Sequence, residues 1–148
     1  YHPELILAGR KLNDSMGSYI GSQLVKAMLK KRILINGSSV LVMGLTFKEN
    51  CPDIRNTKVV DVINELKEYG ILIDCYDPWV DKEQVKNTFG FSPVSYPSLA
   101  KYDGIVLAVS HDEFKTMGVE KLQTFTKHDH VIYDLKYILP LTDSDLRL

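Results

Sequence analysis

The feature that most constrains the fold of this chain is the segment from Val40 to Thr57. It opens with four apolar residues, Val40–Met43, a continuous run that is typical of a strand buried on both faces. A short turn and a polar loop follow, and an amphipathic helix begins at Thr57. Ligands of α/β proteins bind at such junctions, where the carboxyl end of a strand meets the amino end of a helix. Because the loop carries Lys48 and Arg55, we expect an anionic ligand there, such as a phosphate or pyrophosphate.

The alternation of apolar strands and amphipathic helices continues along the rest of the chain. Further strands are predicted at residues 71–76, 105–109 and 131–134. Helices are predicted at residues 57–69, 82–88, 112–117 and 119–125, and a short helical turn at residues 97–102. This order predicts an α/β fold, namely a Rossmann-like parallel sheet with helices on both faces.

One long helix is predicted before this sheet, from Pro3 to about Lys31, because apolar residues recur there with helical spacing. The helix contains Gly9, Gly17 and Gly21, and each glycine costs about 1 kcal/mol relative to alanine inside a helix. Small residues in a row let another backbone come close, so we expect tight packing against another helix. The alternative is a helix that simply lies on its own domain. The chain is therefore divided into a helical element, residues 1–36, and an α/β domain, residues 37–148.

Composition excludes several classes of partner. The formal net charge is -1, with 45% hydrophobic and 25% charged residues, as in ordinary soluble globular proteins. We therefore expect no nucleic acid partner and no membrane partner. The two cysteines suit free thiols in a reducing compartment, so the expected location is cytoplasmic. The chain begins without methionine and looks like a fragment.

Two stretches carry a resemblance to a known family. Residues 44–70 read GLTFKENCPDIRNTKVVDVINELKEYG, and residues 76–78 read YDP. They resemble the C-terminal domain of the UDP-glucose/GDP-mannose dehydrogenases, and most of all the UDP-N-acetylhexosamine 6-dehydrogenases, which serve polysaccharide biosynthesis. The resemblance implies an enzyme that oxidises C6 of the sugar to a carboxylate in two steps, using two NAD and a catalytic cysteine. It also implies a homodimer, with much of the contact made by a long central helix, here residues 1–36.

The same resemblance assigns roles to three residues of the loop. Phe47 and Lys48 would hold the nucleotide-sugar, and Arg55 would approach the NAD held by a preceding domain. From residue types alone, Lys48 could equally be a solvated surface lysine, and the Phe47 ring could seal the core. Arg55 could instead form a salt bridge with Asp53 or Glu49. We expect Asp53 to have a structural role, either capping the helix or orienting Arg55.

A second candidate for substrate contact, Lys136, follows the last predicted strand in the sequence YDLK. Many family members have Asp-Gly-Arg here, and the resemblance implies that this arginine contacts the nucleotide-sugar. Lysine keeps the positive charge but loses the planar fork, and the alternative is a surface lysine. Arg10, Asn13 and Asp14 share one helical face, which either lines an interface near the active site or is solvated.

Several motifs are missing from the sequence. Without G-x-G-x-x-G after the first strand, this is not expected to be the main NAD domain. The family's catalytic cysteine motif, G-F-G-G-x-C-x-P-K-D, is also missing, so Cys51 is not expected to be the nucleophile and the chain should be inactive alone. The histidines lack metal-ligand spacing. A non-enzymatic flavodoxin-like or receiver-like module stays as the alternative, although a receiver requires an acidic cluster after the first strand. An epimerase half would need a Y-x-x-x-K pair, which we do not find.

Overall fold

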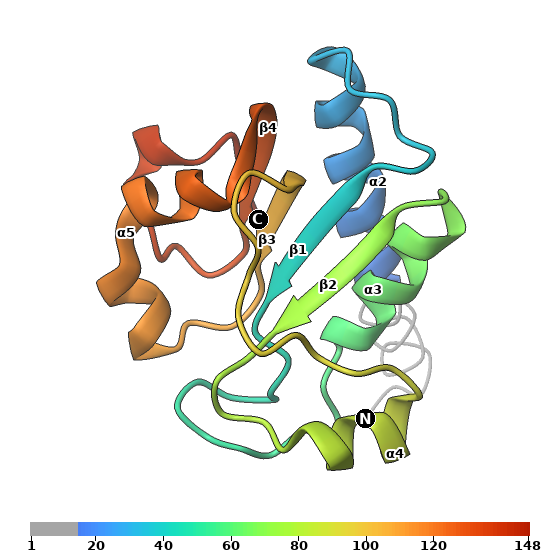
Figure 1. The fold of residues 1–148 in the computed structure, drawn as a ribbon, viewed down its shortest axis with the longest axis vertical. Helices are drawn as coiled ribbons and strands as arrows, with labels where there is room; N and C mark the ends of the chain where they lie inside the picture. The colour runs from blue at the N-terminus through green and yellow to red at the C-terminus, as the bar shows by residue number, and fades with distance from the viewer. Residues whose placement is uncertain (1–14) are drawn as a thin grey trace, which may run out of the picture.

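The computed structural model describes residues 15–148, which form a five-stranded parallel sheet flanked by helices (Figure 1). The strand order is β2-β1-β3-β4-β5, and each neighbouring pair is parallel. The strands are β1 (Ser39–Met43), β2 (Leu72–Tyr76), β3 (Tyr102–Leu107), β4 (Thr126–Asp134) and β5 (Leu146–Arg147). The predicted α/β, Rossmann-like fold is confirmed.

Helices cover both faces of this sheet, as the alternating sequence pattern predicts. In Figure 1, α2 and α3 lie to the right of the sheet and α5 lies to its left. The helices are α2 (Met16–Lys30), α3 (Val59–Glu68), α4 (Lys82–Phe89) and α5 (Asp112–Phe125), and a 3-10 turn spans Leu141–Asp143.

The continuous apolar run of β1 is explained by two separate cores, one on each face of the sheet. Successive side chains of a strand point to opposite faces. Val40 and Val42 accordingly belong to the core beneath α2 and α3, whereas Leu41 and Met43 belong to the core beneath α5. All four side chains are fully buried.

The glycines of α2 pack against α3 of the same chain. A Cβ atom at Gly17 would lie 2.8 Å from the Asp61 Cβ, and one at Gly21 would lie 2.6 Å from the Glu65 Cγ. Within the described residues the helix thus lies on its own domain, which is the alternative of the sequence analysis, and the helix that it contacts closely is α3. The helix ends at Lys30, close to the prediction, while its predicted start at Pro3 lies outside the described residues.

The segment before β3 differs from its prediction. Instead of the short helical turn predicted at residues 97–102, the structure has a turn at residues 99–100, and Tyr102 already begins β3. The early start of this strand is stabilised by a hydrogen bond to another strand. The Tyr102 hydroxyl donates to Asp74 of β2 at 2.7 Å. The two helices predicted at residues 112–117 and 119–125 are confirmed: they form the two parts of α5, which are separated at Gly118 with φ 75° and ψ 167°.

Candidate functional site

The carboxyl ends of β1, β3 and β4 surround a pocket of about 260 Å³. The amino-terminal turns of α2 and α3 complete its wall. Helix α2 contributes Met16 and Ile20 to the lining, and the segment between β1 and α3 contributes Phe47, Asn56 and Lys58. Ser110 follows β3, and Lys136 follows β4. Two of the four predicted site residues, Phe47 and Lys136, thus line one pocket, although they are 89 positions apart in the sequence.

The loop after β1 turns sharply at Gly44. Its φ is +100°, and a Cβ atom there would lie 2.6 Å from the Val109 Cβ. The Gly44 N–H donates to the Tyr76 carbonyl at 2.9 Å, and the Phe47 N–H donates to the Asp53 carbonyl at 2.9 Å. Phe47 is 55% exposed, so its ring does not seal the core. The turn therefore directs an exposed apolar side chain toward the pocket.

A buried carboxylate sets the position of Lys136. Asp134 at the end of β4 is inaccessible to solvent. Its Oδ1 accepts from the Lys136 N–H at 3.1 Å, and its Oδ2 accepts from the Leu139 N–H at 2.8 Å. Asp134 thus closes the turn that carries Lys136. Sequence reasoning did not assign this role, although an acid at the end of a buried strand was a signal for it.

Arg55 forms a salt bridge with Asp53, one of the two acidic partners that the sequence analysis considered for it. The guanidinium Nε and Nη2 donate to the two oxygens of Asp53, each at 3.0 Å. This side-chain hydrogen bond lowers the pKa of Asp53 from its ordinary value and raises the pKa of Arg55. Of the two roles expected for Asp53, the structure therefore shows the orientation of Arg55. The first N–H of α3, that of Val59, donates to the Thr57 hydroxyl at 3.3 Å.

The other predicted residue of the loop, Lys48, lies on the exposed rim and is not among the pocket-lining residues. Its carbonyl accepts from the Thr46 hydroxyl at 2.8 Å. The backbone of Lys48 is therefore held, while the residue is exposed. Arg10, Asn13 and Asp14 lie outside the described residues.

Asp77, which enters the sequence analysis only as a letter of the YDP stretch, has a larger role in the structure. Its carboxylate is buried. Oδ2 accepts from the N–H groups of Leu45 and Thr46 at 2.7 and 3.2 Å, and Oδ1 accepts from the Trp79 N–H at 2.8 Å. Backbone N–H groups after the first strand are the groups that hold the pyrophosphate in a dinucleotide-binding fold. In this chain those at residues 45 and 46 are occupied by a side chain, so the turn does not fit a primary NAD site.

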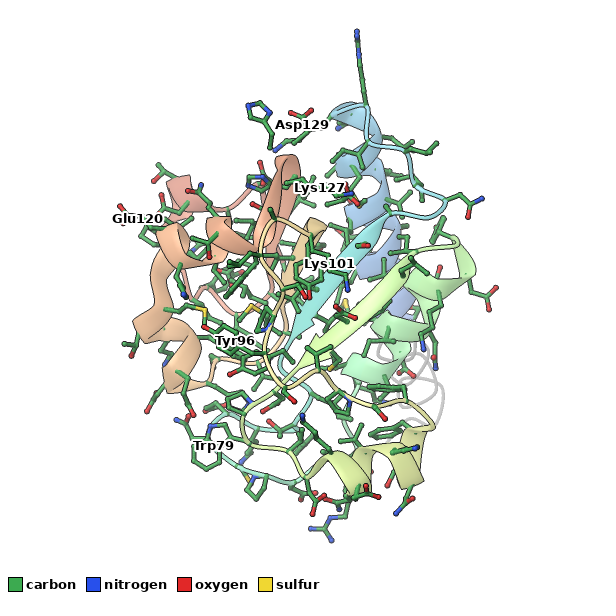
Figure 2. All side chains as sticks on the ribbon, viewed as in Figure 1. Trp79, Tyr96, Lys101, Glu120, Lys127 and Asp129 are labelled. Carbon is green, nitrogen blue, oxygen red and sulfur yellow. The ribbon has the colours of Figure 1, made fainter. Side chains whose placement is uncertain are left out.

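A second pocket, of about 420 Å³, lies at the opposite end of the sheet, beside the amino ends of β1 and β3. Arg32, Asp103, Lys127 and Asp129 are among its lining residues, and none of the predicted site residues is. Figure 2 shows Lys127 and Asp129 at the far end of the molecule from Trp79. This pocket is therefore separate from the candidate site.

Neither a candidate metal cluster nor a disulfide is found among residues 15–148. Residues 15–148 contain no group of three or more His, Cys, Asp or Glu that could hold a metal ion. Cys51 and Cys75 are both free, and burial raises the pKa of the Cys75 thiol. Among the described helices, none has the length and apolar character needed to cross a membrane.

Comparison with known proteins connects this site to a family. Residues 41–140 match the model of the UDP-glucose/GDP-mannose dehydrogenase family, UDP binding domain. Over all 148 residues, the chain is 62% identical to UDP-N-acetyl-D-glucosamine 6-dehydrogenase of Pseudomonas aeruginosa and 56% identical to that of Salmonella typhi. It spans 35% of the length of each of these two relatives.

Solved structures agree with the fold. The native UDP-N-acetyl-mannosamine dehydrogenase of Staphylococcus aureus is similar with a TM-score of 0.71 and 26% identity, over 94% of this chain and 31% of that one. The UDP-D-ManNAc dehydrogenase of Pyrococcus horikoshii has a TM-score of 0.74 over 95% of this chain and 32% of that one. At 22% identity, this second likeness concerns the fold alone.

Proposed function

The chain belongs to the UDP-glucose/GDP-mannose dehydrogenase family, and from this membership we propose that it is the UDP-sugar-binding part of a UDP-N-acetylhexosamine 6-dehydrogenase. The intact enzyme would oxidise C6 of the sugar to a carboxylate and reduce two NAD. The observation that supports the proposal best is the pocket at the carboxyl ends of β1, β3 and β4, which Phe47 and Lys136 both line. The family match over residues 41–140 argues against the alternative, a non-enzymatic flavodoxin-like or receiver-like module.

The pocket offers groups of the kinds that a UDP-sugar requires. Lys136 and Lys58 bring ammonium groups, which pair with phosphate as point charges. The first turn of α3 lines the same pocket, and a helix amino terminus favours an anion. The exposed ring of Phe47 offers an apolar surface to a base or sugar. Lys48, on the rim, would add a further positive charge once the ligand is seated.

NAD would be held mainly by the preceding part of the protein, because the turn after β1 is occupied by Asp77. When bound, NAD supplies the hydride acceptor. We propose that Arg55 approaches this cofactor from outside the pocket, which its 83% exposed side chain supports. Asp53 would hold the guanidinium in a fixed direction for that contact.

The test is a titration of the chain with UDP by isothermal calorimetry. A charge-assisted contact contributes roughly 1.5–3 kcal/mol, so Lys136→Ala should weaken UDP binding about tenfold or more. Lys30→Ala removes the same charge from the far end of α2 and should leave the affinity unchanged. If UDP does not bind the chain, or if both variants bind it equally well, the assignment of the pocket is wrong.

We also propose a homodimer, a cytoplasmic location and a role in polysaccharide biosynthesis. The glycines of α2 face α3, so a second subunit would contact the outer side of the helix, where Tyr19 and Leu29 are 51% and 57% exposed. Residues 1–36 would then connect the NAD-binding domain to the UDP-sugar-binding domain, residues 37–148. The same residues would form the contact between the two subunits. Sedimentation analysis should show a dimer that Leu29→Asp weakens, and a monomeric wild-type chain would contradict this proposal.

A further inference from the structure

His111 is a buried titratable residue that the proposed function does not use. It directly precedes α5 and is fully inaccessible to solvent. The Trp79 ring stacks on it with centroids 6.0 Å apart, and the Phe114 ring meets it edge-on at 5.3 Å. Figure 2 shows Trp79 below α5, beside the loops at the carboxyl ends of the strands. The imidazole is thus enclosed directly beneath the loop that follows β1.

Both ring nitrogens of His111 have partners, and these partners determine its tautomer. Nδ1 lies 2.9 Å from the backbone nitrogen of Asn50, which can only donate, so Nδ1 accepts. Nε2 must then carry the proton, and it donates to Asp77 Oδ2 at 2.9 Å. The Thr46 hydroxyl donates its own proton to the Lys48 carbonyl. Its Oγ1, 3.2 Å from Nε2, is therefore a second acceptor for the Nε2–H, in a bifurcated hydrogen bond with Asp77. A doubly protonated ring would place an N–H against the Asn50 N–H.

These contacts hold both ends of the short segment that carries the predicted ligand contacts. Thr46 is held at one end by His111 and by the carboxylate of Asp77. Asn50 is held at the other end, where its N–H donates to the imidazole and its φ is 56°, a left-handed conformation that asparagine tolerates better than most residues. Between these two anchors, Phe47 and Lys48 are exposed.

We propose that His111 is a positioning residue: its neutral imidazole, protonated on Nε2, fixes the loop that presents Phe47 and Lys48 to the UDP-sugar. This inference rests on the proposed function of the pocket. It extends that function to a residue that touches no ligand and acts through the Asn50 and Thr46 contacts. Asp77 is the second member of the arrangement, because it accepts the Nε2 proton and both N–H groups at the start of the loop.

The first experiment needs no ligand. Nitrogen-15 spectra of the imidazole should report a proton on Nε2 and none on Nδ1, and the opposite tautomer would overturn the proposal. His111→Phe keeps an aromatic ring but no ring nitrogen, and it should shift the amide resonances of residues 46–50. If those resonances are unchanged in a folded variant, His111 does not position the loop.

The second experiment separates positioning from general stability. His111→Phe should weaken UDP binding about tenfold while the variant remains folded by circular dichroism. His111→Asn keeps an acceptor for the Asn50 N–H and should recover part of that affinity. Phe125→Leu, a matched control in the core beneath α5, should lower stability but leave UDP affinity unchanged. Equal affinity losses in His111→Phe and Phe125→Leu would mean that His111 is only structural.

The two experiments distinguish a failure of this inference from a failure of the proposed function. If the wild-type chain binds no UDP, the pocket assignment fails, while the tautomer and the amide shifts still test whether His111 holds the loop. If the wild-type chain binds UDP and His111→Phe binds it equally well, only the present inference fails.

Discussion

At the scale of single residues, two carboxylates define what the site can bind. Asp77 occupies the N–H groups after β1, and Asp134 closes the turn that carries Lys136. Both are buried and both accept backbone N–H groups, which compensates the cost of removing them from water. The first blocks the usual dinucleotide site, while the second brings a positive charge to the pocket.

Gly44 offers a sharp test of the turn after β1. Alanine there would be strained at φ +100° and would collide with Val109, so Gly44→Ala should lower the free energy of unfolding by about 3 kcal/mol. Gly37 has a similar φ of +85° but open space around it, so Gly37→Ala should cost only about 1 kcal/mol. Urea unfolding of both variants measures the difference. Equal losses would show that the contact with Val109 does not matter.

The two cysteines should differ in reactivity. Cys75 is buried in β2, and burial raises the pKa of its thiol, so little thiolate is available to an alkylating reagent. Cys51 is partly exposed in the loop after β1. Iodoacetamide labelling followed by mass spectrometry should modify Cys51 in the native chain and Cys75 only after unfolding. Protection of Cys51 by UDP would further indicate that the ligand lies beside this loop.

At the scale of elements, the contact between α2 and α3 explains the glycines that local helix propensity disfavours. Both helices cover the same face of the sheet (Figure 1). Gly17 and Gly21 remove the Cβ atoms that would otherwise separate the two helices. The cost of glycine within α2 is thus offset by closer packing on α3.

Both glycines should resist replacement by alanine. At Gly17 a new Cβ would lie 2.8 Å from the Cβ and 3.0 Å from the backbone carbon of Asp61, so Gly17→Ala should destabilise the fold by about 1–2 kcal/mol. At Gly21 it would lie 2.6 Å from the Glu65 Cγ and 3.3 Å from the Glu65 Cβ, which are not the free end of that side chain. Gly21→Ala should therefore also destabilise the fold, by about 1 kcal/mol or less, because the gain in helix propensity offsets part of the clash. Thermal unfolding of both variants measures the losses, and a gain at Gly21 would show that Glu65 moves aside freely.

At the scale of the whole molecule, the chain spans about a third of the length of its relatives. The family's cysteine motif is absent from the 148 residues. We therefore expect the purified chain to reduce no NAD in the presence of UDP-N-acetylhexosamines, as followed by NADH absorbance. Turnover above that of a boiled sample would contradict this expectation, and UDP binding by the same preparation serves as its positive control.

The sequence by itself determined the order and type of most elements. Apolar runs and helical spacing predicted β1 and α3 to within two residues, because burial on one or both faces leaves a local pattern. The same pattern failed at Tyr102, where a strand begins with polar side chains whose partners lie in other strands. The family resemblance directed attention to Phe47 and Lys136, and the structure brings both to one pocket.

Tertiary structure alone decided which polar groups meet. His111, Asp77 and Thr46 are separated by 34 and 31 residues along the chain, yet they form one buried hydrogen-bonded group. No local periodicity encodes such a contact, because it depends on where three different strands end. For the same reason, the sequence left open whether the helix that carries Gly17 and Gly21 packs on another helix or lies on its own domain, and the structure packs both glycines against α3.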